Sequence, residues 1–268
     1  MTAAASLTLV GAGRMGSALL HGWLKGAARD IAVVEPTPRP EIQALADAGR
    51  IRLNPAPAES SIIVLAVKPQ QFAAVSGQAK AFVGAGSLAI SIMAGVRISQ
   101  LSQRLGTDRV IRSMPNTPGA IGQGVTVFTA PEAARREDLA AARELLAPLG
   151  DVHGPVAEEM MSAVTALSGS GPAYVFLLAE VMAEAGMAQG LPRELAISLA
   201  RKTVEGAAAL MAESGDAPEA LRKAVTSPGG TTQAALDILM DTGGMAALFR
   251  TALSAAANRD RQLSQEAD

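Results

Sequence analysis

The chain has 268 residues, 49% of them hydrophobic, and is therefore long enough for one large domain or two of ordinary size. Its 23 basic and 25 acidic residues are spread without long runs of one sign, and the formal net charge of −2 argues against a nucleic-acid partner. Cysteine is absent and only two histidines occur, which excludes disulfides, thiolate nucleophiles and cysteine-ligated metals, so we expect no metal site.

Signals for export or membrane insertion are weak in this sequence. Residues 1–10 lack the basic start of a cleavable signal, and no run of about 18 uninterrupted apolar residues occurs along the chain. We therefore expect a cytoplasmic protein that does not enter a membrane.

Short apolar runs rich in valine and isoleucine, bounded by glycine, proline or asparagine, dominate the first half of the chain. Runs of this kind predict strands buried on both faces, at residues 7–10, 31–34, 61–67, 87–93, 110–114 and 125–128. Stretches with helical spacing lie between several of them, as at residues 17–24 and 41–48. The alternation predicts βαβ units and a mostly parallel sheet.

The second half of the chain has a helical pattern. After about His153, apolar residues recur at intervals of three and four, and helices are predicted at residues 193–213, 232–240 and 245–263. One further stripe consists of Val175, Leu178, Met182 and Ala185. So many apolar helical positions favour a dimer in which the helical halves pack together, with a monomeric bundle as the alternative.

A glycine-rich turn follows the first predicted strand and opens the first predicted helix. It reads Gly11-Ala12-Gly13-Arg14-Met15-Gly16, the G-x-G-x-x-G pattern that places a dinucleotide pyrophosphate at a helix N-terminus. The alternative is a plain strand-to-helix turn. The pattern predicts a Rossmann-type domain over residues 1–154, with Gly11, Gly13, Arg14, Met15 and Gly16 binding the cofactor. The helical periodicity of the second half predicts an all-helical domain over residues 155–268.

The loop after the second predicted strand bears on which dinucleotide is bound. Glu35 ends that strand, about twenty residues past the glycine turn, where an acidic residue commonly holds the ribose hydroxyls of NAD. Thr37 and Arg39 follow, and a guanidinium suits the 2′-phosphate of NADPH. The alternative for Glu35 is a solvated loop carboxylate, and the choice between NADH and NADPH stays open.

Three further strand ends are predicted to surround the nicotinamide, because ligands of open parallel sheets lie beyond the carboxyl ends of the strands. They are residues 66–69, 91–95 and 114–118. Lys68 has the alternative of a surface cation, and Asn116 that of a turn former beside two prolines. The cofactor-binding residues predicted here are Ala66, Val67, Lys68, Pro69, Met93, Ala94 and Asn116.

With these segments assembled, the chain resembles the pyrroline-5-carboxylate reductases over essentially its whole length. The matching segments are residues 11–16, 66–69 and 114–118, together with SGSGPAY at 168–174 and SPGGTT at 227–232. The last two carry most of the specificity, since many dehydrogenases share the glycine-rich turn.

The resemblance implies an NADPH- or NADH-dependent reductase that converts 1-pyrroline-5-carboxylate to L-proline. It also implies a helical dimerisation domain, an active site where two subunits interlock, and a homodimer that can form larger rings. By the same resemblance, the loop from Ser227 to Thr232 receives the substrate carboxylate, and the Thr232 hydroxyl contacts the ring nitrogen as the catalytic residue.

The chemistry of the loop agrees with those roles. Gly229 and Gly230 expose backbone N–H groups, and Thr231 or Thr232 is suited to cap the following helix, so that a carboxylate would bind at its N-terminus. The alternative is a helix start without a ligand. The predicted substrate-binding residues are Ser227, Gly229, Gly230, Thr231 and Thr232.

Other candidates are weaker. The SGSGPAY segment is predicted to break a helix, and a packing role for it is as well supported as substrate contact by Ser168 or Ser170. Tyr174 is expected to be a packed aromatic rather than a proton donor, and neither His21 nor His153 is assigned to catalysis.

Two other classes of protein share parts of this pattern. One is a two-domain oxidoreductase of the β-hydroxyacid or 6-phosphogluconate type, but Lys202 and Lys223 lack the context of its catalytic lysine. The other is a dinucleotide sensor without chemistry, which the intact substrate loop disfavours. Against the family pattern, Glu35 and Pro36 stand where small hydroxyl or basic residues are expected, which puts an NADPH preference in doubt.

Overall fold

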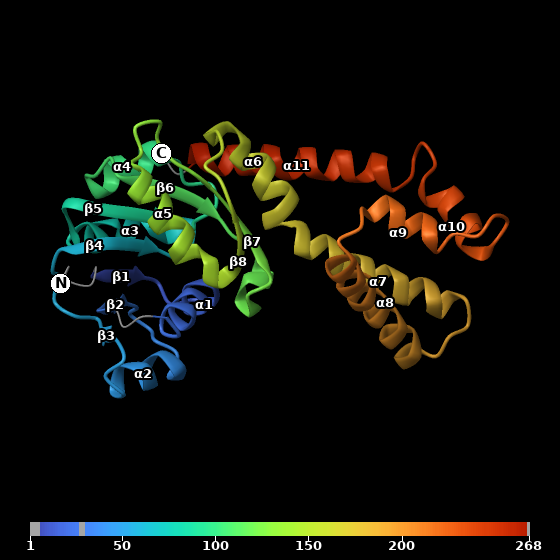
Figure 1. Cartoon of the computed structure of the whole chain (residues 1–268), viewed down its shortest axis with the longest axis horizontal. Coiled ribbons are helices and arrows are strands. Elements are labelled where there is room, and N and C mark those ends of the chain that lie inside the picture. Colours follow the sequence, from blue (N-terminus) through green and yellow to red (C-terminus); the bar gives the residue numbers. More distant parts are fainter. Residues whose placement is uncertain (1–5, 27–29, 267–268) are drawn as a thin grey trace. The chain divides into compact units, whose positions relative to one another are not determined.

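A computed structural model describes residues 6–26 and 30–266. Its contacts divide the chain into two compact units (Figure 1). The first comprises the described residues up to Ser170 together with those from Ala256 onward, and the second comprises Gly171–Ala255. The first unit thus extends past the predicted boundary at residue 154 and also takes in the end of the last helix.

The first unit is built on one sheet of eight strands in the order β3-β2-β1-β4-β5-β6-β7-β8. All neighbours pair in parallel except β6 and β7, which are antiparallel. A mostly parallel sheet is what the sequence predicted. The strands are β1 Leu7–Val10, β2 Ile31–Val34, β3 Arg52–Leu53, β4 Ser60–Leu65, β5 Val83–Ser91, β6 Val110–Met114, β7 Gly124–Thr129 and β8 Gly150–His153.

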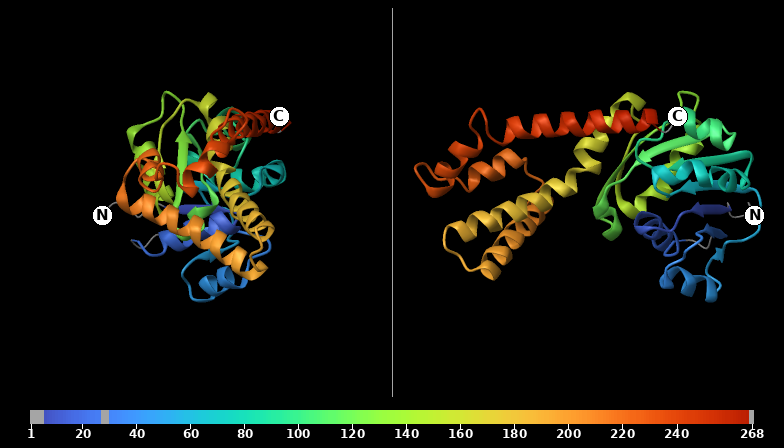
Figure 2. Two further views of the ribbon diagram at one scale, coloured as in Figure 1. Left: turned by 90° about the vertical axis from the view of Figure 1, so that its right-hand side faces the viewer. Right: turned by 180° about the vertical axis from the view of Figure 1, so that it is seen from behind.

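Helices cover both faces of this sheet (Figures 1 and 2). One buried cluster joins β1 to α1 and α5 and includes Leu9, Leu20 and Leu145, while the other joins β4 to α3 and α4 and includes Leu65 and Leu101. The α/β layering therefore closes two cores within a single unit. The helices are α1 Arg14–Trp23, α2 Pro40–Asp47, α3 Pro69–Lys80, α4 Ile98–Leu105 and α5 Arg136–Leu146.

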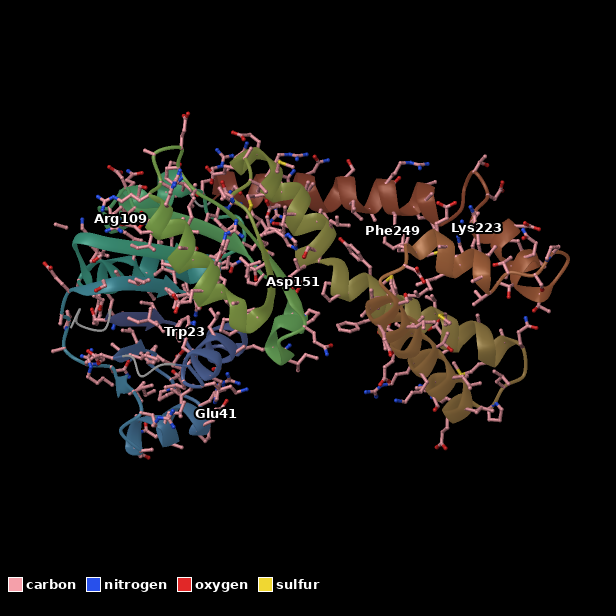
Figure 3. The ribbon with its side chains drawn as sticks, in the orientation of Figure 1. Trp23, Glu41, Arg109, Asp151, Lys223 and Phe249 are labelled. Carbon is pink, nitrogen blue, oxygen red and sulfur yellow. The ribbon has the colours of Figure 1, made fainter. Side chains whose placement is uncertain are left out.

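Trp23, at the end of α1, shows how one of these layers is fixed. Its side chain is 5% exposed, and its indole N–H donates to the carbonyl oxygen of Leu145 on α5 at 2.8 Å (Figure 3). A buried indole N–H needs an acceptor, and a carbonyl in the last turn of a neighbouring helix supplies one. This bond ties α1 to α5 on one face of the sheet.

The second unit contains α7 Gly171–Ala188, α8 Arg193–Ser214, α9 Pro218–Ala224, α10 Thr231–Leu239 and the first part of α11 Met245–Glu266. Helices α7 and α8 lie side by side as a hairpin, visible in both views of Figure 2. The predicted helices 193–213, 232–240 and 245–263 match α8, α10 and α11 to within one to three residues at each end, the uncertainty usual for helix ends.

A nearly continuous helical run leads into this unit. It consists of η3 Glu158–Met160, α6 Met161–Val164, the π-helical turn η4 Thr165–Gly169, and α7. The SGSGPAY segment interrupts the regular α-helix, as predicted: the π turn Thr165–Gly169 replaces α-helical bonding, Ser170 belongs to no helix, and α7 starts at Gly171. A π turn inserts an extra residue without ending the helix, and such turns are frequent at functional sites.

The run Glu158–Ala188 is also the one segment, among the residues the structure describes, that is long and apolar enough by length and composition to cross a membrane. A helix of a protein that stays in water passes the same test when other protein surface covers it. Length and composition therefore do not decide what covers this helix.

The end of α11 belongs to the first unit and is held there by buried polar groups. Asp260 is 4% exposed and accepts a hydrogen bond from Ser162 Oγ at 2.8 Å, and Gln100 Nε2 donates to the carbonyl oxygen of Ser264 at 3.0 Å. The chain therefore leaves the first unit after Ser170 and returns to it at the start of residues 256–266.

Candidate active site

The glycine-rich turn lies between β1 and α1, as predicted, and two of its glycines are required by close packing. Gly11 has φ of +92°, and a Cβ there would lie 2.8 Å from the carbonyl oxygen of Ala66. A Cβ on Gly16 would lie 2.3 Å from the carbonyl oxygen of Gly11. The first turn of α1 therefore packs directly against the end of β4, which only glycine permits.

Gly13 differs from these two, because nothing lies within 4 Å of where its Cβ would be. It is the residue before α1, with extended backbone angles, and no side chain caps the helix. The N–H groups of Arg14, Met15 and Gly16 begin the helix and have no acceptor within it. The turn thus presents an uncovered helix N-terminus, the surface that a pyrophosphate requires.

Arg14 and Met15 take different positions beside this turn. Arg14 is exposed at the start of α1. Met15 is half-buried, and its Cε lies 3.1 Å from where a Cβ on Gly119 would be, so its side chain packs toward the segment after β6. Arg14 is therefore free to turn toward an anion, whereas Met15 forms part of the wall.

Glu35 follows β2 and is bound to the same turn. Its Oε2 accepts the N–H of Ala12 at 2.8 Å, and its Oε1 accepts the N–H of Thr37 at 3.2 Å. The solvated loop carboxylate considered as the alternative is therefore not what the structure shows. Glu35 is half-buried and lies directly beside the backbone that would approach a cofactor.

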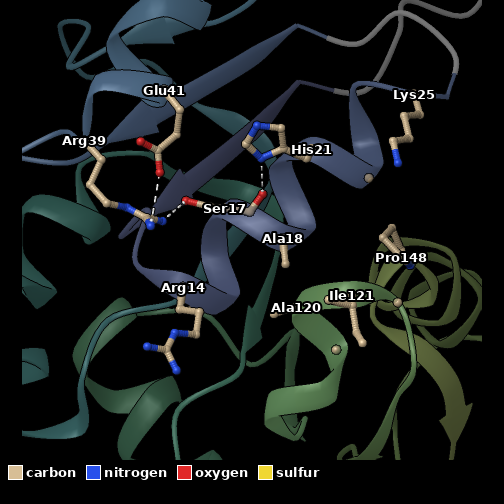
Figure 4. A pocket seen from close by; sticks show the side chains of 13 residues that line it. Arg14, Ser17, Ala18, His21, Lys25, Arg39, Glu41, Ala120, Ile121 and Pro148 are labelled. Carbon is tan, nitrogen blue, oxygen red and sulfur yellow. Dashed lines mark hydrogen bonds and ion pairs between the residues drawn. The ribbon is translucent and has the colours of Figure 1, made fainter.

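Arg39 lies on the other side of the turn, in a network drawn in Figure 4. Its guanidinium donates to Ser17 Oγ at 2.7 Å and lies 3.1 Å from Glu41 Oε1. It also donates to the carbonyl oxygens of Ala12 and Gly13, both at 3.3 Å. Arg39 thus braces the turn from the side of α2.

The network opens onto a pocket of about 430 Å³ along the outer face of α1 (Figure 4). Its walls come from α1, the start of α2, the segment after β6 and Pro148. Basic side chains predominate among its polar groups: Arg14, His21, Lys25 and Arg39, against the single carboxylate of Glu41.

The ends of β4 and β5 lie where the sequence placed them, although both strands end earlier than predicted. Strand β4 stops at Leu65, so Ala66 and Val67 form the loop against Gly11, and Lys68 precedes α3, which begins at Pro69. The prediction had β4 continue to Val67, which fails because the chain leaves the sheet to pass the glycine turn.

At the end of β5 the predicted strand was also too long. The strand stops at Ser91, whose Oγ accepts the N–H of Met93 at 3.2 Å and so turns the chain. Met93 is buried, with 2% exposure, and belongs to the core cluster between β4 and α3. Ala94 is half-buried beside it.

Asn116 links the end of β6 to the SGSGPAY segment. Its Oδ1 accepts the N–H of Val125 at 2.9 Å, and its Nδ2 is 3.4 Å from Ser168 Oγ. Met114 lies against the same segment, since a Cβ on Gly169 would be 2.3 Å from its Cε. Asn116 is therefore more than a turn former: it joins two sheet strands and the π-helical turn.

The loop from Ser227 to Thr232 lies in the second unit and leads into α10. Gly229 has φ of +70°, and the N–H of Gly230 donates to the carbonyl oxygen of Ser227 at 3.0 Å. The prediction that Thr231 or Thr232 caps the helix was wrong, because Gly230 is the cap and the two threonines are the first helical residues. A Cβ on Gly230 would lie 2.4 Å from Ser227 Oγ, so a larger residue there would displace the Ser227 hydroxyl.

Because the N-cap residue Gly230 has no side chain, the N-terminus of α10 also lacks a side-chain cap. No side chain bonds to its first N–H groups, and nothing lies within 4 Å of where a Cβ on Gly229 would be. Thr232 is half-buried and Ser227 exposed. The loop therefore offers backbone N–H groups and hydroxyls to a small anion.

The remaining titratable candidates are one packed tyrosine and two exposed histidines. Tyr174 packs edge to face on Phe249 with ring centroids 6.0 Å apart, the packed position expected of it. His21 is exposed on α1 and bonds to the carbonyl oxygen of Ser17 at 2.7 Å, and His153 is exposed at the end of β8. Within residues 6–26 and 30–266, no three metal-ligating side chains gather.

Known proteins match both halves of the chain. A family model described as pyrroline-5-carboxylate reductase dimerisation matches residues 158–263, and one described as NADP oxidoreductase, coenzyme F420-dependent, matches residues 6–95. A pyrroline-5-carboxylate reductase of Arabidopsis thaliana is 42% identical over 77% of this chain and 74% of its own length. The chain belongs to the pyrroline-5-carboxylate reductase family. The resemblance seen in the sequence is confirmed.

Relatives in the same family align over nearly the whole chain. The Escherichia coli reductase is 36% identical over 96% of this chain and 97% of its own. The structure of the Coxiella burnetii reductase matches with a TM-score of 0.86 and 32% identity, covering 97% of this chain and 98% of that one. A Plasmodium falciparum pyrroline carboxylate reductase, solved with NADP bound, matches with a TM-score of 0.79 and 27% identity over 97% and 98% of the two chains.

These matches confirm the predicted fold class and enzyme class. The chain is an NAD(P)H-dependent oxidoreductase of proline biosynthesis, a pyrroline-5-carboxylate reductase, with a dinucleotide-binding sheet domain followed by a helical dimerisation domain. The prephenate dehydrogenase of Aquifex aeolicus, at 14% identity and a TM-score of 0.51, shares the fold alone.

Sequence reasoning missed two residues that shape the site. Asn54 exchanges hydrogen bonds with the backbone of Glu35, and Ser17 Oγ accepts a hydrogen bond from Arg39. Ser168, which lies 3.4 Å from Asn116 Nδ2, was among the candidates that the sequence singled out. Asn54 and Ser17 had no signal, because their roles depend on contacts between segments far apart in the chain.

Proposed function

We propose that this chain reduces the C=N bond of 1-pyrroline-5-carboxylate by hydride transfer from NADH or NADPH, with the glycine turn holding the cofactor and the loop from Ser227 to Thr232 holding the substrate. The observation that carries the proposal is the pair of uncapped helix N-termini, at Gly13 before α1 and at Gly230 before α10. Nothing lies within 4 Å of where a Cβ would be on Gly13, before α1, or on Gly229, in the turn before α10. Each of these helix N-termini therefore suits an anion.

The cofactor site comprises the segments already described at the carboxyl edge of the sheet. The N–H groups that begin α1 receive the pyrophosphate, Arg14 is free to neutralise it, and Glu35, Thr37 and Arg39 lie at the adenosine end. Ala66 to Pro69, Met93, Ala94 and Asn116 line the nicotinamide end. The NADP bound in the Plasmodium falciparum relative supports this role for the domain.

The substrate carboxylate binds at the start of α10. Its charge is complementary to the free N–H groups and the positive end of the helix dipole, and the hydroxyls of Ser227 and Thr231 lie in the same turn. An amide cradle of this kind fixes the orientation of a small acid without a buried cation.

The reaction requires little acid–base equipment. The bound nicotinamide supplies a hydride, and the protein orients the reactants. With the imine nitrogen protonated, hydride addition to the imine carbon forms the C–H bond, and the electron pair of the C=N bond becomes the lone pair of the amine. Thr232 holds the ring nitrogen by accepting its N–H, which fixes the imine carbon toward the nicotinamide.

The assembly we propose is a homodimer, in which the helical domains of two copies cover each other. The match of residues 158–263 to a dimerisation model and the exposed apolar side chains of α7 and α8 support it. Two finer proposals are a larger ring of dimers, which the family resemblance implies, and a cytoplasmic location, which was the expectation from the sequence.

Replacing Thr232 tests the proposed substrate site. Thr232→Ala is expected to lower kcat/KM for pyrroline-5-carboxylate by about ten- to a hundred-fold, because it removes the hydroxyl that orients the nitrogen. Thr232→Ser retains the hydroxyl and is expected to stay within a few-fold of wild type. Cofactor affinity, followed by NADH fluorescence, should be the same in all three proteins.

Wild-type kcat/KM in Thr232→Ala would remove Thr232 from the mechanism. An equal loss in Thr232→Ser would show that the residue acts through packing rather than through its hydroxyl.

A further inference from the structure

Glu35 is held in one position by the glycine turn and by its own loop. One carboxylate oxygen accepts the N–H of Ala12 at 2.8 Å, and the other accepts the N–H of Thr37 at 3.2 Å. Each oxygen keeps a second lone pair for another donor. The side chain is half-buried, so it is a fixed acceptor rather than a mobile surface charge.

The backbone of Glu35 is fixed as well. Its N–H donates to Asn54 Oδ1 at 2.8 Å, and Asn54 Nδ2 donates to its carbonyl oxygen at 2.9 Å. Asn54 adopts a positive φ of 46° in doing so, a conformation that asparagine tolerates better than most residues. Both the backbone and the side chain of Glu35 are therefore held by hydrogen bonds, so the carboxylate cannot easily turn away from a bound nucleotide.

Arg39, the nearby cation that would favour a phosphate, is already engaged. It pairs with Glu41 at 3.1 Å and bonds to Ser17 Oγ at 2.7 Å and to two backbone carbonyl oxygens of the turn (Figure 4). Its charge is balanced by Glu41, and leaving this position would leave Ser17 and the carbonyl oxygens without that donor. Arg39 thus acts as a brace of the turn.

These contacts discriminate between the two nicotinamide cofactors. The 2′-hydroxyl of the NADH ribose is a donor that the free lone pairs of Glu35 can accept. The 2′-phosphate of NADPH has no donor to offer and brings a charge of about −1.5 to −2 next to the fixed carboxylate. The first arrangement gains a hydrogen bond, and the second gains a like-charge repulsion.

We propose that Glu35 makes this reductase favour NADH over NADPH, with a dissociation constant for NADH at least about ten-fold lower than that for NADPH. The inference rests on the proposed function in one respect only, that the glycine turn binds a nicotinamide dinucleotide. It assigns Glu35 as the residue that determines cofactor specificity.

The test measures dissociation constants for NADH and NADPH by fluorescence titration in the absence of substrate. The proteins are wild type, Glu35→Gln, and Glu41→Gln as the matched control. The Glu35→Gln side chain keeps an oxygen for the N–H of Ala12 but loses the charge, whereas Glu41→Gln neutralises the carboxylate in the first turn of α2 that pairs with Arg39.

Wild type is expected to bind NADH at least ten-fold more tightly than NADPH. Glu35→Gln should shift the ratio toward NADPH by about ten-fold or more, and Glu41→Gln by less than a third as much. A wild type that binds NADPH as tightly as NADH overturns the proposal whether or not the variants fold. So does a Glu35→Gln ratio within two-fold of wild type, or an equal shift in Glu41→Gln.

The binding ratio is independent of turnover. A protein that discriminates as proposed yet fails to reduce pyrroline-5-carboxylate would contradict the proposed function while leaving the role of Glu35 intact. A protein that reduces the imine equally well with either cofactor, and binds both equally, would contradict the role of Glu35 while leaving the proposed function intact.

Discussion

The two units of this chain use apolar residues in opposite ways. In the first unit, large side chains such as Leu9, Leu20 and Phe128 are fully buried in cores that the unit closes by itself. In the second, the buried hydrophobic residues of the described chain are the alanines 183, 196 and 200, while large side chains such as Phe176 and Leu248 are more than half exposed. The second unit is therefore complete only when other protein covers it.

The difference explains why one helix of the chain is long and apolar enough to resemble a membrane span. The run Glu158–Ala188 ends in α7, whose apolar residues point in several directions around the helix, and a helix that is hydrophobic all round is buried in its working state. In a family with a dimerisation domain over residues 158–263, a second copy supplies that burial.

The largest expected effect comes from a double substitution that disrupts the dimer surface of the second unit and leaves the first unit unaltered. The double change Phe176→Asp and Leu199→Asp places charges on α7 and α8, where a dimer would bury them without partners. Sedimentation equilibrium should show a monomer, and NADH oxidation should fall by about a hundred-fold or more.

The matched control is Ile121→Asp in the first unit, where the side chain is 75% exposed. This variant should keep the oligomeric mass of wild type. If Ile121→Asp dissociates the dimer while the double variant does not, the dimer surface belongs to the first unit and the account is contradicted.

The next effect separates two kinds of glycine within the first unit. Gly16→Ala forces a methyl group to 2.3 Å from a backbone oxygen and should cost about 2–4 kcal/mol of unfolding free energy. Gly13→Ala meets nothing within 4 Å, so its melting temperature should match wild type while its NAD(P)H affinity falls by about ten-fold, because the methyl lies where the pyrophosphate must approach.

Differential scanning calorimetry and NADH titration on the two variants check this contrast. A Gly13→Ala protein that binds cofactor normally would show that the pyrophosphate does not lie over this turn.

The smallest expected effect concerns Asn116, which joins β6 and β7 to the π-helical turn. Asn116→Asp keeps an oxygen for the N–H of Val125 but loses the donor to Ser168, and a loss of about three-fold in kcat is expected. Asn116→Ala loses both bonds and should fall by about ten-fold. A wild-type rate in Asn116→Asp would mean that the contact with Ser168, at 3.4 Å, contributes nothing, and equal rates in the two variants would mean the same of the bond to Val125.

The sequence predicted the first unit in most of its detail because its signals are local. Six strands, the glycine turn and the position of Glu35 all follow from periodicity and spacing within short segments. The two short strands β3 and β8 were not predicted, since β3 has only two residues and β8 alternates exposed and half-buried positions in a polar segment.

The rest depended on contacts that no spacing shows. The bond to Ala12 shows that Glu35 is not a solvated loop carboxylate, and the contacts with Glu41 and Ser17 show how Arg39 is held, but none of these contacts follows from spacing in the sequence. In the second unit the helices were predicted well, but the cap of α10 was not, because Gly230 and either threonine fit the same pattern.

The most direct test of the central claim, that the chain delivers a hydride to the imine carbon, uses NADH deuterated at C4 of the nicotinamide on the transferred face. Reaction with 1-pyrroline-5-carboxylate should give L-proline with one deuterium at C5, the former imine carbon, seen by NMR and mass spectrometry. Oxidation of the cofactor without deuterated proline, or deuterium at any other carbon, would contradict the account.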